Sequence, residues 1–305
     1  MSLTAEVPVR PRLADLATTV GCPAQVDVLP LPAPSWGAEA ALDALAEARL
    51  VLPFVVRPAR VVAALTTVVL RAGRYAVKVY PPGTEAEHLT RTDLALAGSR
   101  TAVLPLTSPV VTSSGVVVVH PWVRHAGPVT WAETGALLRL FHDDHADADV
   151  PAWDPLRRLV SQVVGLPADA GMVLLDARET LLTAVGQLDS RLGVGVVHGD
   201  VSPGNVLRTT EGPALIDLDF VARAPREYDL TSAARRFLAG EIDAQTYRGF
   251  CDAYGADVLG WDGRVVLDRI AELGGVAFRL WDDRHHGRTD HPWLDDAVRE
   301  WRTAL

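Results

Sequence analysis

The order of the predicted elements indicates an α+β protein with two lobes, a small N-terminal lobe built on a β-sheet and a larger, mostly helical C-terminal lobe. Strand segments rich in β-branched residues gather between residues 60 and 120, whereas most segments after residue 128 repeat their apolar residues with a helical period. The chain has 305 residues, of which 49% are hydrophobic and 22% charged, as in a globular protein larger than one small core.

The bulk composition excludes several classes of partner. The net charge of −9 argues against nucleic acid and against an anionic membrane surface. Cys22 and Cys251 form neither a disulfide framework nor a metal-spacing pattern, so we expect a reducing compartment, the cytoplasm. Residues 1–12 lack the apolar segment of a signal peptide, and no stretch approaches the length of a membrane span.

Residues 1–57 are expected to form a helical extension or a lid. Segments 12–20 and 38–50 have the pattern of short amphipathic helices. A proline-rich connector at 29–34 separates them. Both roles are compatible with this pattern.

The next segment predicts three strands, at 60–63, 67–71 and 74–80, with a hairpin turn at 72–73. The third strand places Lys78 among apolar residues. Lysine is depleted from buried strands unless its charge is paired, which indicates a functional ammonium group. A solvent-facing lysine on an edge strand is the alternative.

The most informative segment carries Asp200, Asn205 five residues later and Asp217 twelve residues after that. An apolar strand at 195–197 leads into it, and a predicted hairpin over 206–216 returns the chain to the same place. Oxygen-bearing side chains are the ligands that Mg²⁺ prefers. Phosphoryl transfer needs one carboxylate for the attacking hydroxyl and further oxygen ligands for the metal on the nucleotide phosphates. The spacing therefore predicts Mg²⁺-dependent phosphoryl transfer.

Helices are predicted over most of the remaining chain. Thr130 and Glu133 have the pattern of a capping box before a helix at 131–142, which ends in a packed or capping His142. Further helices are expected at 84–97, 154–164, 170–192, 229–239, 243–254, 262–283 and 292–304.

The motif His198-Gly199-Asp200, with Asn205 and the later Ile216-Asp217, resembles that of the aminoglycoside phosphotransferase and choline kinase group, relatives of the protein kinases. By this resemblance, Asp200 is the catalytic base and also faces the substrate, and Asn205 and Asp217 are the metal ligands. His198 braces the loop.

The resemblance also implies a bilobal protein-kinase-like fold. Its parts would be a nucleotide-binding N-lobe at 58–120, a hinge at 121–127 and a catalytic and acceptor-binding C-lobe at 128–305. Residues 1–57 would precede this fold as the extension or lid.

In the family, the strand lysine contacts the α and β phosphates and pairs with a helix carboxylate. Lys78 would take this role toward ATP or GTP. Asp93 has the fitting offset for the carboxylate, with Glu87 as the alternative. Aspartate is one methylene shorter than the glutamate that is usual there, so the helix would have to lie closer.

No Gly-x-Gly-x-x-Gly, the phosphate-covering loop of protein kinases, occurs in this chain, and small-molecule kinases of this superfamily often lack these glycines. Thr66 and Thr67 lie at the equivalent turn, where they and backbone N–H groups would approach phosphate. The apolar strand at 116–119 would lead into a lobe connector whose backbone holds the nucleobase. The residues assigned to that connector are His120, Pro121, Trp122 and Val123.

Three further polar positions have assigned roles. Asp219 could contact a second metal or brace the loop, and both readings stay open. Asp229 matches another acidic position of the family, and we expect it to act as a helix charge or cap. Ser202, assigned to the substrate side, stands where protein kinases carry a lysine, which favours a small-molecule kinase.

The expected acceptor carries an amine. Trp281, Asp282 and Asp283 combine an indole with two acids, a set that suits an ammonium group through carboxylate and cation–π contacts. Such acceptors include amino sugars, amino alcohols, and aminoglycoside-like or other antibiotics, which makes antibiotic resistance one of the roles considered. The alternative is a solvated helix end anchored by a tryptophan.

The predicted function is therefore Mg²⁺-dependent transfer of a nucleotide γ-phosphoryl group to a hydroxyl of a small acceptor, by a monomer or homodimer. A catalytically silent, kinase-like nucleotide-binding protein is one alternative. A haloacid-dehalogenase-type phosphatase is another, because the run from Asp217 to Val221 fits its nucleophile motif. That motif normally opens the first strand of a βαβ domain, whereas mostly helical segments follow here.

Overall fold

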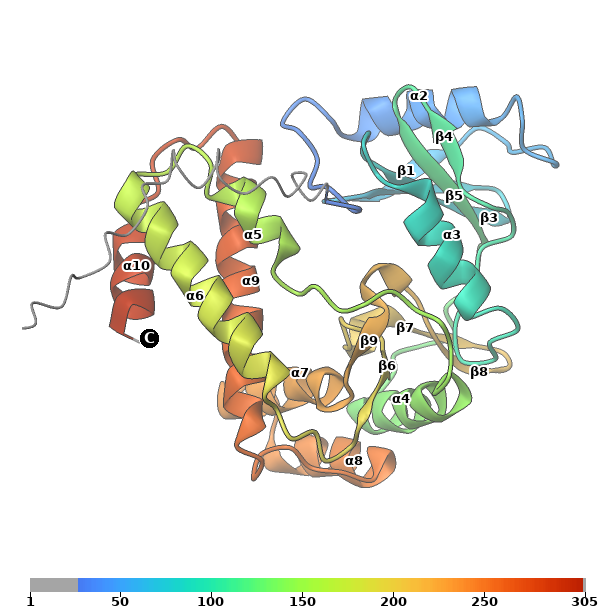
Figure 1. Cartoon of the computed structure of the whole chain (residues 1–305). Helices are drawn as coiled ribbons and strands as arrows, with labels where there is room; N and C mark the ends of the chain where they lie inside the picture. The colour runs from blue at the N-terminus through green and yellow to red at the C-terminus, as the bar shows by residue number, and fades with distance from the viewer. Residues whose placement is uncertain (1–26, 304–305) are drawn as a thin grey trace, which may run out of the picture.

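The structure, a computed structural model, describes residues 27–303 and has two lobes (Figure 1). The N-terminal lobe is built on an antiparallel sheet with the strand order β1-β2-β3-β5-β4. Its strands are β1 (Arg60–Ala64), β2 (Val68–Ala72), β3 (Tyr75–Tyr80), β4 (Val110–Thr112) and β5 (Gly115–Pro121). The three strands predicted between residues 60 and 80 are confirmed. The helix expected at 12–20 lies outside the described residues.

The alternation of side chains along β3 decides where Lys78 points. Successive residues of a strand face opposite sides of the sheet. Val77 and Val79 are fully buried in the core that α2 (Ala38–Ala48) forms with the sheet. Lys78 consequently projects from the other face, on which α3 (Ala86–Ala95) also packs.

The C-terminal lobe is mostly helical, as predicted. The capping box is confirmed, because the Glu133 N–H donates to Thr130 Oγ1 at 3.2 Å and the Thr130 N–H donates to Glu133 Oε2 at 2.9 Å. The helices are α4 (Trp131–Asp144), α5 (Arg157–Gln162), α6 (Ala168–Gly186), α7 (Glu227–Leu238), α8 (Ala244–Tyr254), α9 (Gly263–His285) and α10 (Leu294–Thr303).

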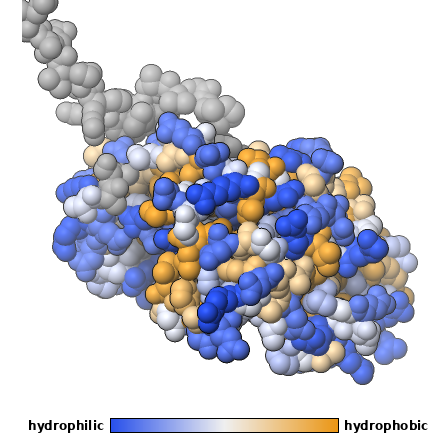
Figure 2. All heavy atoms as spheres, turned by 90° about the horizontal axis from the view of Figure 1, so that it is seen from below, coloured by the Kyte–Doolittle hydropathy of each residue, from blue (hydrophilic) through white to orange (hydrophobic). Residues whose placement is uncertain are grey.

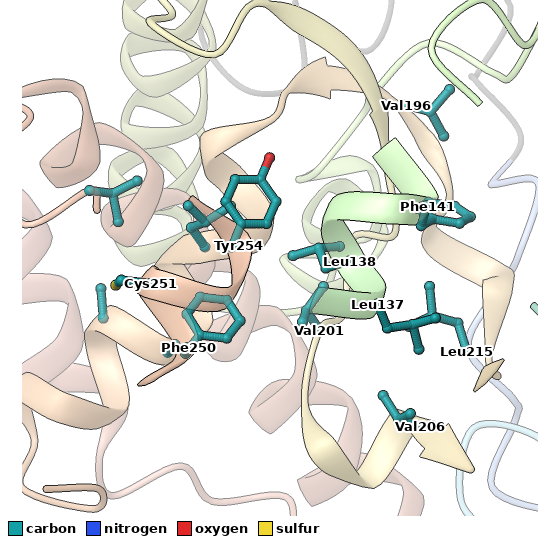
Figure 3. Close-up of a cluster of buried hydrophobic side chains, with 14 of the residues drawn as sticks. Leu137, Leu138, Phe141, Val196, Val201, Val206, Leu215, Phe250, Cys251 and Tyr254 are labelled. Carbon is teal, nitrogen blue, oxygen red and sulfur yellow. The ribbon is translucent and has the colours of Figure 1, made fainter. Parts of the chain in front are cut away.

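Two apolar cores hold these helices together. One joins α4 and α8, where Leu137, Leu138 and Phe250 pack (Figure 3). Val201 and Val206 belong to the same core and anchor the chain on both sides of the 202–205 turn. The other core joins α5, α6, α9 and α10.

Four short strands frame the segment that the sequence singles out. They are β6 (Val194–Val197), β7 (Val206–Thr209), β8 (Gly212–Leu215) and β9 (Ala222–Pro225). β7 and β8 form the predicted hairpin, and β6 pairs with β9. The sequence does not predict β4 or β9.

Residues 27–36 connect the two lobes. The Glu85 N–H donates to the Val28 carbonyl at 2.9 Å on the N-terminal side. The Trp281 indole N–H donates to the Pro32 carbonyl at 2.9 Å on the C-terminal side. This segment thus lies against both lobes next to the opening between them.

The surface seen from below carries hydrophilic side chains between smaller groups of apolar ones (Figure 2). Within residues 27–303, no helix has the length and apolar character needed to cross a bilayer.

Candidate functional site

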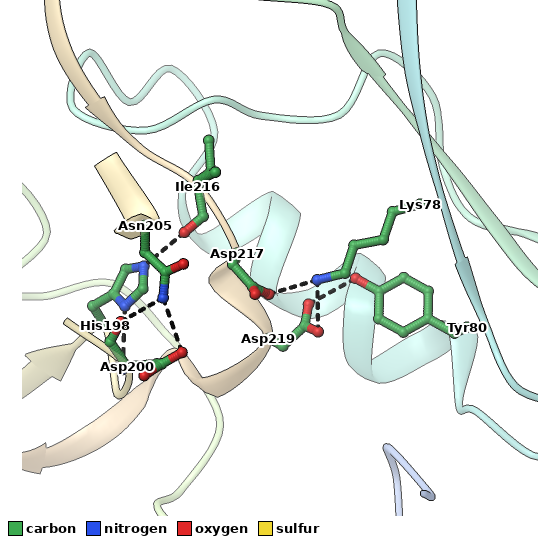
Figure 4. A network of polar contacts seen from close by, with 8 residues as sticks. All are labelled: Lys78, Tyr80, His198, Asp200, Asn205, Ile216, Asp217 and Asp219. Atoms are coloured by element: carbon green, nitrogen blue, oxygen red, sulfur yellow. Dashed lines mark hydrogen bonds and ion pairs between the residues drawn. The ribbon is translucent and has the colours of Figure 1, made fainter. Parts of the chain in front are cut away.

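Residues 198–205 form the loop between β6 and β7 and carry Asp200 and Asn205. The Asn205 side-chain amide donates to the Asp200 carbonyl at 2.8 Å and to Asp200 Oδ2 at 2.9 Å (Figure 4). The Asn205 amide oxygen is directed toward Asp217 (Figure 4). The structure thus brings together the acid, the amide and the second acid that the sequence singles out.

The buried His198 ring ties the loop to the end of the β7–β8 hairpin. The Asp200 N–H donates to His198 Nδ1 at 3.2 Å, and Nε2 lies 2.9 Å from the Ile216 carbonyl. A backbone N–H can only donate and a carbonyl can only accept, so the ring proton belongs on Nε2. This geometry supports the bracing role that the family resemblance implies for His198.

Asp229 holds the loop of residues 198–205 through its backbone. Its Oδ2 accepts from the His198 N–H at 2.7 Å, and its Oδ1 accepts from the Gly199 N–H at 2.8 Å. His142 Nε2 lies 2.9 Å from Oδ2, and His142 Nδ1 lies 2.8 Å from the Tyr254 hydroxyl. Asp229 lies in the first turn of α7, as expected for a helix charge, but it does not cap that helix. This fully buried carboxylate bonds instead to two backbone N–H groups of a distant loop.

The backbone of Asp217 is left-handed, with φ 63° and ψ 60°. No other non-glycine residue among residues 27–303 has a positive φ. Such a conformation costs about 1–3 kcal/mol and is found mostly at functional sites. Here it turns the chain between β8 and the short η2 helix (Leu218–Phe220), which brings the carboxylate to Lys78.

The Lys78 ammonium lies between two carboxylates of the C-terminal lobe. Its Nζ is 2.6 Å from Asp217 Oδ1 and 2.7 Å from Asp219 Oδ2 (Figure 4). The Tyr80 hydroxyl donates to Asp219 Oδ1 at 2.7 Å. Asp219 therefore holds both Lys78 and Tyr80, a role that the sequence does not suggest.

The pairing expected between Lys78 and a carboxylate of α3 is corrected. Among the described residues, the ion pairs of Lys78 are those with Asp217 and Asp219. Asp93 lines the same cavity as Lys78, but its side chain is short and the ammonium is already satisfied. Glu87 lies in a separate surface hollow.

Burial and charge shift the pKa values of this cluster. Burial would lower the pKa of Lys78, but the charges of Asp219 and Asp217 hold it well above its ordinary value. Burial would raise the pKa of Asp219, yet Lys78 and the Tyr80 hydroxyl keep it below its usual range. Burial, followed by the charge of Asp219, raises the pKa of Asp93 to about 7. Lys78 and Asp219 are thus both charged at neutral pH.

Two cavities meet at these residues. The hinge-side cavity, of about 460 Å³, lies between the N-terminal sheet and the β7–β8 hairpin, with Leu207 and Ile216 on its C-terminal side. The helix-side cavity, of about 380 Å³, lies between α5, α7 and α9 and contains Asp200. Asp217 and Asp219 line both cavities, so the two cavities adjoin at these residues.

The predicted nucleotide-contacting residues line this space. Thr67 faces the hinge-side cavity and Thr66 the helix-side cavity, so the β1–β2 turn borders both. His120, Pro121, Trp122 and Val123 all line the hinge-side cavity.

Two groups of the lobe connector limit how a nucleobase could bind. The Trp122 N–H donates to the Arg74 carbonyl at 2.8 Å, so a nucleobase would have to use other backbone groups. Burial, followed by the charge of Lys78, lowers the pKa of His120 to about 4. The His120 imidazole is therefore neutral at physiological pH.

The predicted acceptor residues lie elsewhere, which corrects that expectation. Trp281 is buried and its indole N–H bonds to Pro32, and Asp283 is buried against Arg288, His291 and Trp293. Asp282 pairs with Arg288. Trp281, Asp282 and Asp283 are not among the described residues that line either cavity. The physical reason is that Trp281 is satisfied by the Pro32 carbonyl and the two aspartates by neighbours within the C-terminal lobe.

Ser202 also lies outside both linings. Its carbonyl accepts from the Asn205 N–H at 3.0 Å and closes the short η1 turn (Pro203–Asn205). It thereby supports the position of Asn205.

Sequence reasoning missed the aromatic side chains of the helix-side cavity. Trp153, Tyr228, Phe220 and Phe278 all line it, and they come from four separate segments. It also missed His88, which borders both cavities and whose pKa is lowered to about 4 by burial and then by Arg157. No spacing in the sequence links these residues, so only the fold could reveal them.

The donor set fits Mg²⁺. The described residues form no closed cluster of three or more acidic, histidine or cysteine side chains that could hold a metal ion. Asp217 offers a carboxylate oxygen on the wall of both cavities, and the amide oxygen of Asn205, which lies outside the two linings, is directed toward it (Figure 4). Mg²⁺ in phosphoryl-transfer sites is commonly held by one or two such groups together with phosphates and water.

Comparisons with known proteins agree with this geometry. The model of a family described as "Phosphotransferase enzyme family" matches residues 59–268. A search of curated proteins found no match.

Solved structures share the fold at low identity. An amicoumacin kinase in complex with AMP-PNP, Ca²⁺ and its ligand has a TM-score of 0.64 and 14% identity, covering 85% of this chain and 91% of that chain. A choline kinase from Streptococcus pneumoniae has a TM-score of 0.59 and 15% identity, covering 86% and 98%. A spectinomycin phosphotransferase in complex with ADP and spectinomycin has a TM-score of 0.54 and 13% identity, covering 85% and 92%. The predicted bilobal, kinase-like α+β fold is confirmed.

Proposed function

Because the chain belongs to the phosphotransferase enzyme family, we propose that it transfers the γ-phosphoryl group of ATP or GTP to a hydroxyl group of a small molecule, with Mg²⁺ as the metal. One observation carries this proposal. Asp217 lines both cavities, where it pairs with Lys78 of the hinge-side lining, and Asp200 of the helix-side lining accepts from the Asn205 amide beside it. The hinge-side cavity has the position for a nucleotide, and the helix-side cavity has the position for an acceptor.

Asp200 is the proposed base. It lines the helix-side cavity, and its Oδ2 is oriented by the Asn205 amide. A carboxylate at this point would orient the acceptor hydroxyl and accept its proton as the bond to phosphorus forms. Most of the rate enhancement in such a reaction comes from positioning and charge stabilisation.

Lys78 is the proposed phosphate-binding cation. Its ammonium stays protonated because of its two carboxylate partners, and it lies at the inner end of the hinge-side cavity. There it would offset the charge of the phosphate oxygens. Asp219 and Tyr80 would keep it at that point.

Asn205 and Asp217 would hold the metal. The metal that they hold would supply positive charge to offset the negative charge that develops on the nucleotide phosphates during transfer. ATP is the favoured donor because similar structures were solved with AMP-PNP or ADP.

The decisive test replaces Asp200 by asparagine, which keeps its shape and removes its basicity. We expect phosphoryl transfer to fall by about a thousandfold or more, while the Kd for Mg²⁺–AMP-PNP stays within about threefold. Transfer is measured by ³¹P NMR against a panel of hydroxyl compounds, and binding by calorimetry. Retained transfer in Asp200→Asn would contradict the assignment.

The metal ligands should behave differently. Asn205→Ala and Asp217→Ala should each raise the Mg²⁺ concentration needed for nucleotide binding by about tenfold or more, because each removes one oxygen ligand. Ser202→Ala is the matched control in the same loop and should leave this concentration unchanged. An equal Mg²⁺ requirement in all variants would remove the metal assignment.

Nucleotide binding separates one alternative function from the proposed one, and the topology argues against the other. A catalytically silent scaffold would bind nucleotide without dependence on Mg²⁺. The phosphatase alternative is disfavoured by topology, because Asp217 follows β8 of a two-stranded antiparallel hairpin and not the first strand of a parallel sheet.

A further inference from the structure

We infer that the acceptor has a largely apolar body, aromatic or alicyclic, and that the site does not select a polycationic amino sugar. The inference rests on the proposed function, since it assigns the helix-side cavity to the acceptor. Its volume of about 380 Å³ is within the range of small-molecule sites. Two walls of this cavity and the charges on its lining define which acceptor it fits.

Aromatic rings form one wall. Trp153 and Tyr228 lie against each other with their ring centroids 4.6 Å apart. Phe220 and Phe278 also line the cavity, and they keep 38% and 40% of their surface exposed. Large apolar side chains that remain exposed around one hollow are typical of a ligand site.

Small residues of α9 form the second wall. Ala271, Gly274 and Ala277 line the cavity at spacings of three, on one side of the helix. Glycine inside a helix costs about fivefold in the helix equilibrium relative to alanine, so its presence calls for a reason. A Cβ placed on Gly274 would meet no atom within 4 Å. The helix therefore offers a flat surface with free space above it.

The carboxylates of the helix-side cavity lie mostly at one end. Asp200, Asp217 and Asp219 are gathered at the phosphoryl-transfer end. Among the described residues that line the cavity, Asp154 is the one carboxylate outside this group, and it lies 3.9 Å from Arg178.

Two arginines accompany Asp154 on the same segment. Arg157 and Arg158 line the cavity, and Arg157 pairs with Asp27 at 3.1 Å. Away from the phosphoryl-transfer end, a compound with several ammonium groups would thus meet guanidinium groups and rings, with Asp154 as the one carboxylate of the described lining to replace its hydration. An apolar body would instead exchange water for the rings and the surface of α9.

The test uses equilibrium binding, which needs neither nucleotide nor turnover. Naphthylethanol is the apolar probe, and neamine, a polyamino sugar, is the cationic probe. Each is titrated into the full-length protein by calorimetry. We expect naphthylethanol to bind with a Kd of about 1 mM or lower. We expect neamine to bind at least about tenfold more weakly.

A pair of neighbouring glycines supplies the matched variants. Gly274→Leu places a side chain over the α9 surface and should weaken naphthylethanol binding by about tenfold or more. Gly275→Leu changes the adjacent, exposed position, where a Cβ also meets no atom within 4 Å, and should leave the affinity within about twofold. Circular dichroism should show both variants folded, because both replace a helical glycine by a better helix former.

Three results would overturn the inference: tighter binding of neamine than of naphthylethanol, no naphthylethanol binding at millimolar concentration, or equal affinities in Gly274→Leu and the unchanged protein. Failure of the proposed function would appear elsewhere, as nucleotide binding without Mg²⁺ dependence or as full transfer by Asp200→Asn. The two failures are therefore distinguishable.

Discussion

Lys78 is held from the C-terminal lobe, by Asp217 and Asp219, and not from helix α3. This arrangement follows from side-chain length and competition. Two carboxylates already lie within 2.7 Å of the ammonium, and Asp93 has one methylene fewer than a glutamate at the same place. Asp93 is left as a half-buried carboxyl group on the wall of the hinge-side cavity.

Asp93 should make stability depend on pH. The pKa of Asp93 is about 7 in the folded chain and 3.8 in the unfolded chain. Between these pH values the native state therefore binds more protons than the unfolded state. The free energy of unfolding should therefore fall as the pH rises from about 4 to about 7. Asp93→Asn should remove this slope. It should match the unchanged protein below pH 4 and have a Tm a few degrees higher above pH 7.

Glu87→Gln, on the same helix, is the control for Asp93→Asn. It removes the same charge at an exposed position and should not change the slope. Thermal unfolding followed from pH 4 to pH 8 gives both measurements. A parallel pH dependence in Asp93→Asn and the unchanged protein would contradict the assigned burial of this carboxyl group.

At the scale of elements, the loop between β6 and β7 depends on a close approach of two backbones. Gly199 has φ 84°, and a Cβ there would lie 2.5 Å from the Phe220 carbonyl oxygen. The short distance keeps the β8–β9 connection, with Asp217 and Asp219, beside the loop that carries Asp200. Asp229 secures the same point by accepting the His198 and Gly199 N–H groups.

Gly199→Ala should therefore damage both stability and turnover. We expect a loss of about 2 kcal/mol in the free energy of unfolding, from a left-handed backbone and a steric clash. Phosphoryl transfer should fall with it, because Asp200 is the next residue. Denaturant unfolding and the transfer assay measure the two effects.

Gly204→Ala is the matched control in the same loop. Its φ lies outside the left-handed region, and an added Cβ would meet only Ser202 Oγ, at 3.4 Å. The change in stability should stay within about 0.5 kcal/mol. Equal losses in Gly199→Ala and Gly204→Ala would show that the close approach to Phe220 is not what the loop requires.

At the scale of the whole molecule, the site lies where the two lobes meet. The Lys78–Asp217 and Lys78–Asp219 ion pairs cross between them, and residues 27–36 contact both. A nucleotide in the hinge-side cavity would add contacts to both lobes at once. Binding of that kind stabilises the native state by mass action.

Mg²⁺ and nucleotide together should thus stabilise the whole chain. At a concentration about one hundred times the Kd, Mg²⁺–AMP-PNP should add about 2.7 kcal/mol. This corresponds to a rise of roughly 5 °C in Tm. EDTA should remove most of the gain, and Asn205→Ala should reduce it. A rise of equal size in EDTA would show that binding does not involve the metal.

The local elements were open to prediction because each signal lies within a few residues. The capping box at Thr130 and Glu133 and the β7–β8 hairpin follow from turn chemistry and periodicity. The acid and amide positions of the 198–217 segment follow from spacing alone. By contrast, Asp229 is a loop anchor and not a helix cap, because its partners lie 30 and 31 residues away.

The sequence by itself determined the chemistry of this protein: which side chains bear charge or oxygen, and that a loop and a hairpin present them together. The tertiary structure alone decided which carboxylates hold Lys78, 139 and 141 residues away, and which rings line the helix-side cavity. It also moved Trp281, Asp282 and Asp283 away from that space. The physical reason is range: turns and helix caps depend on neighbours in the chain, whereas ion pairs and cavity walls depend on packing between segments distant in sequence.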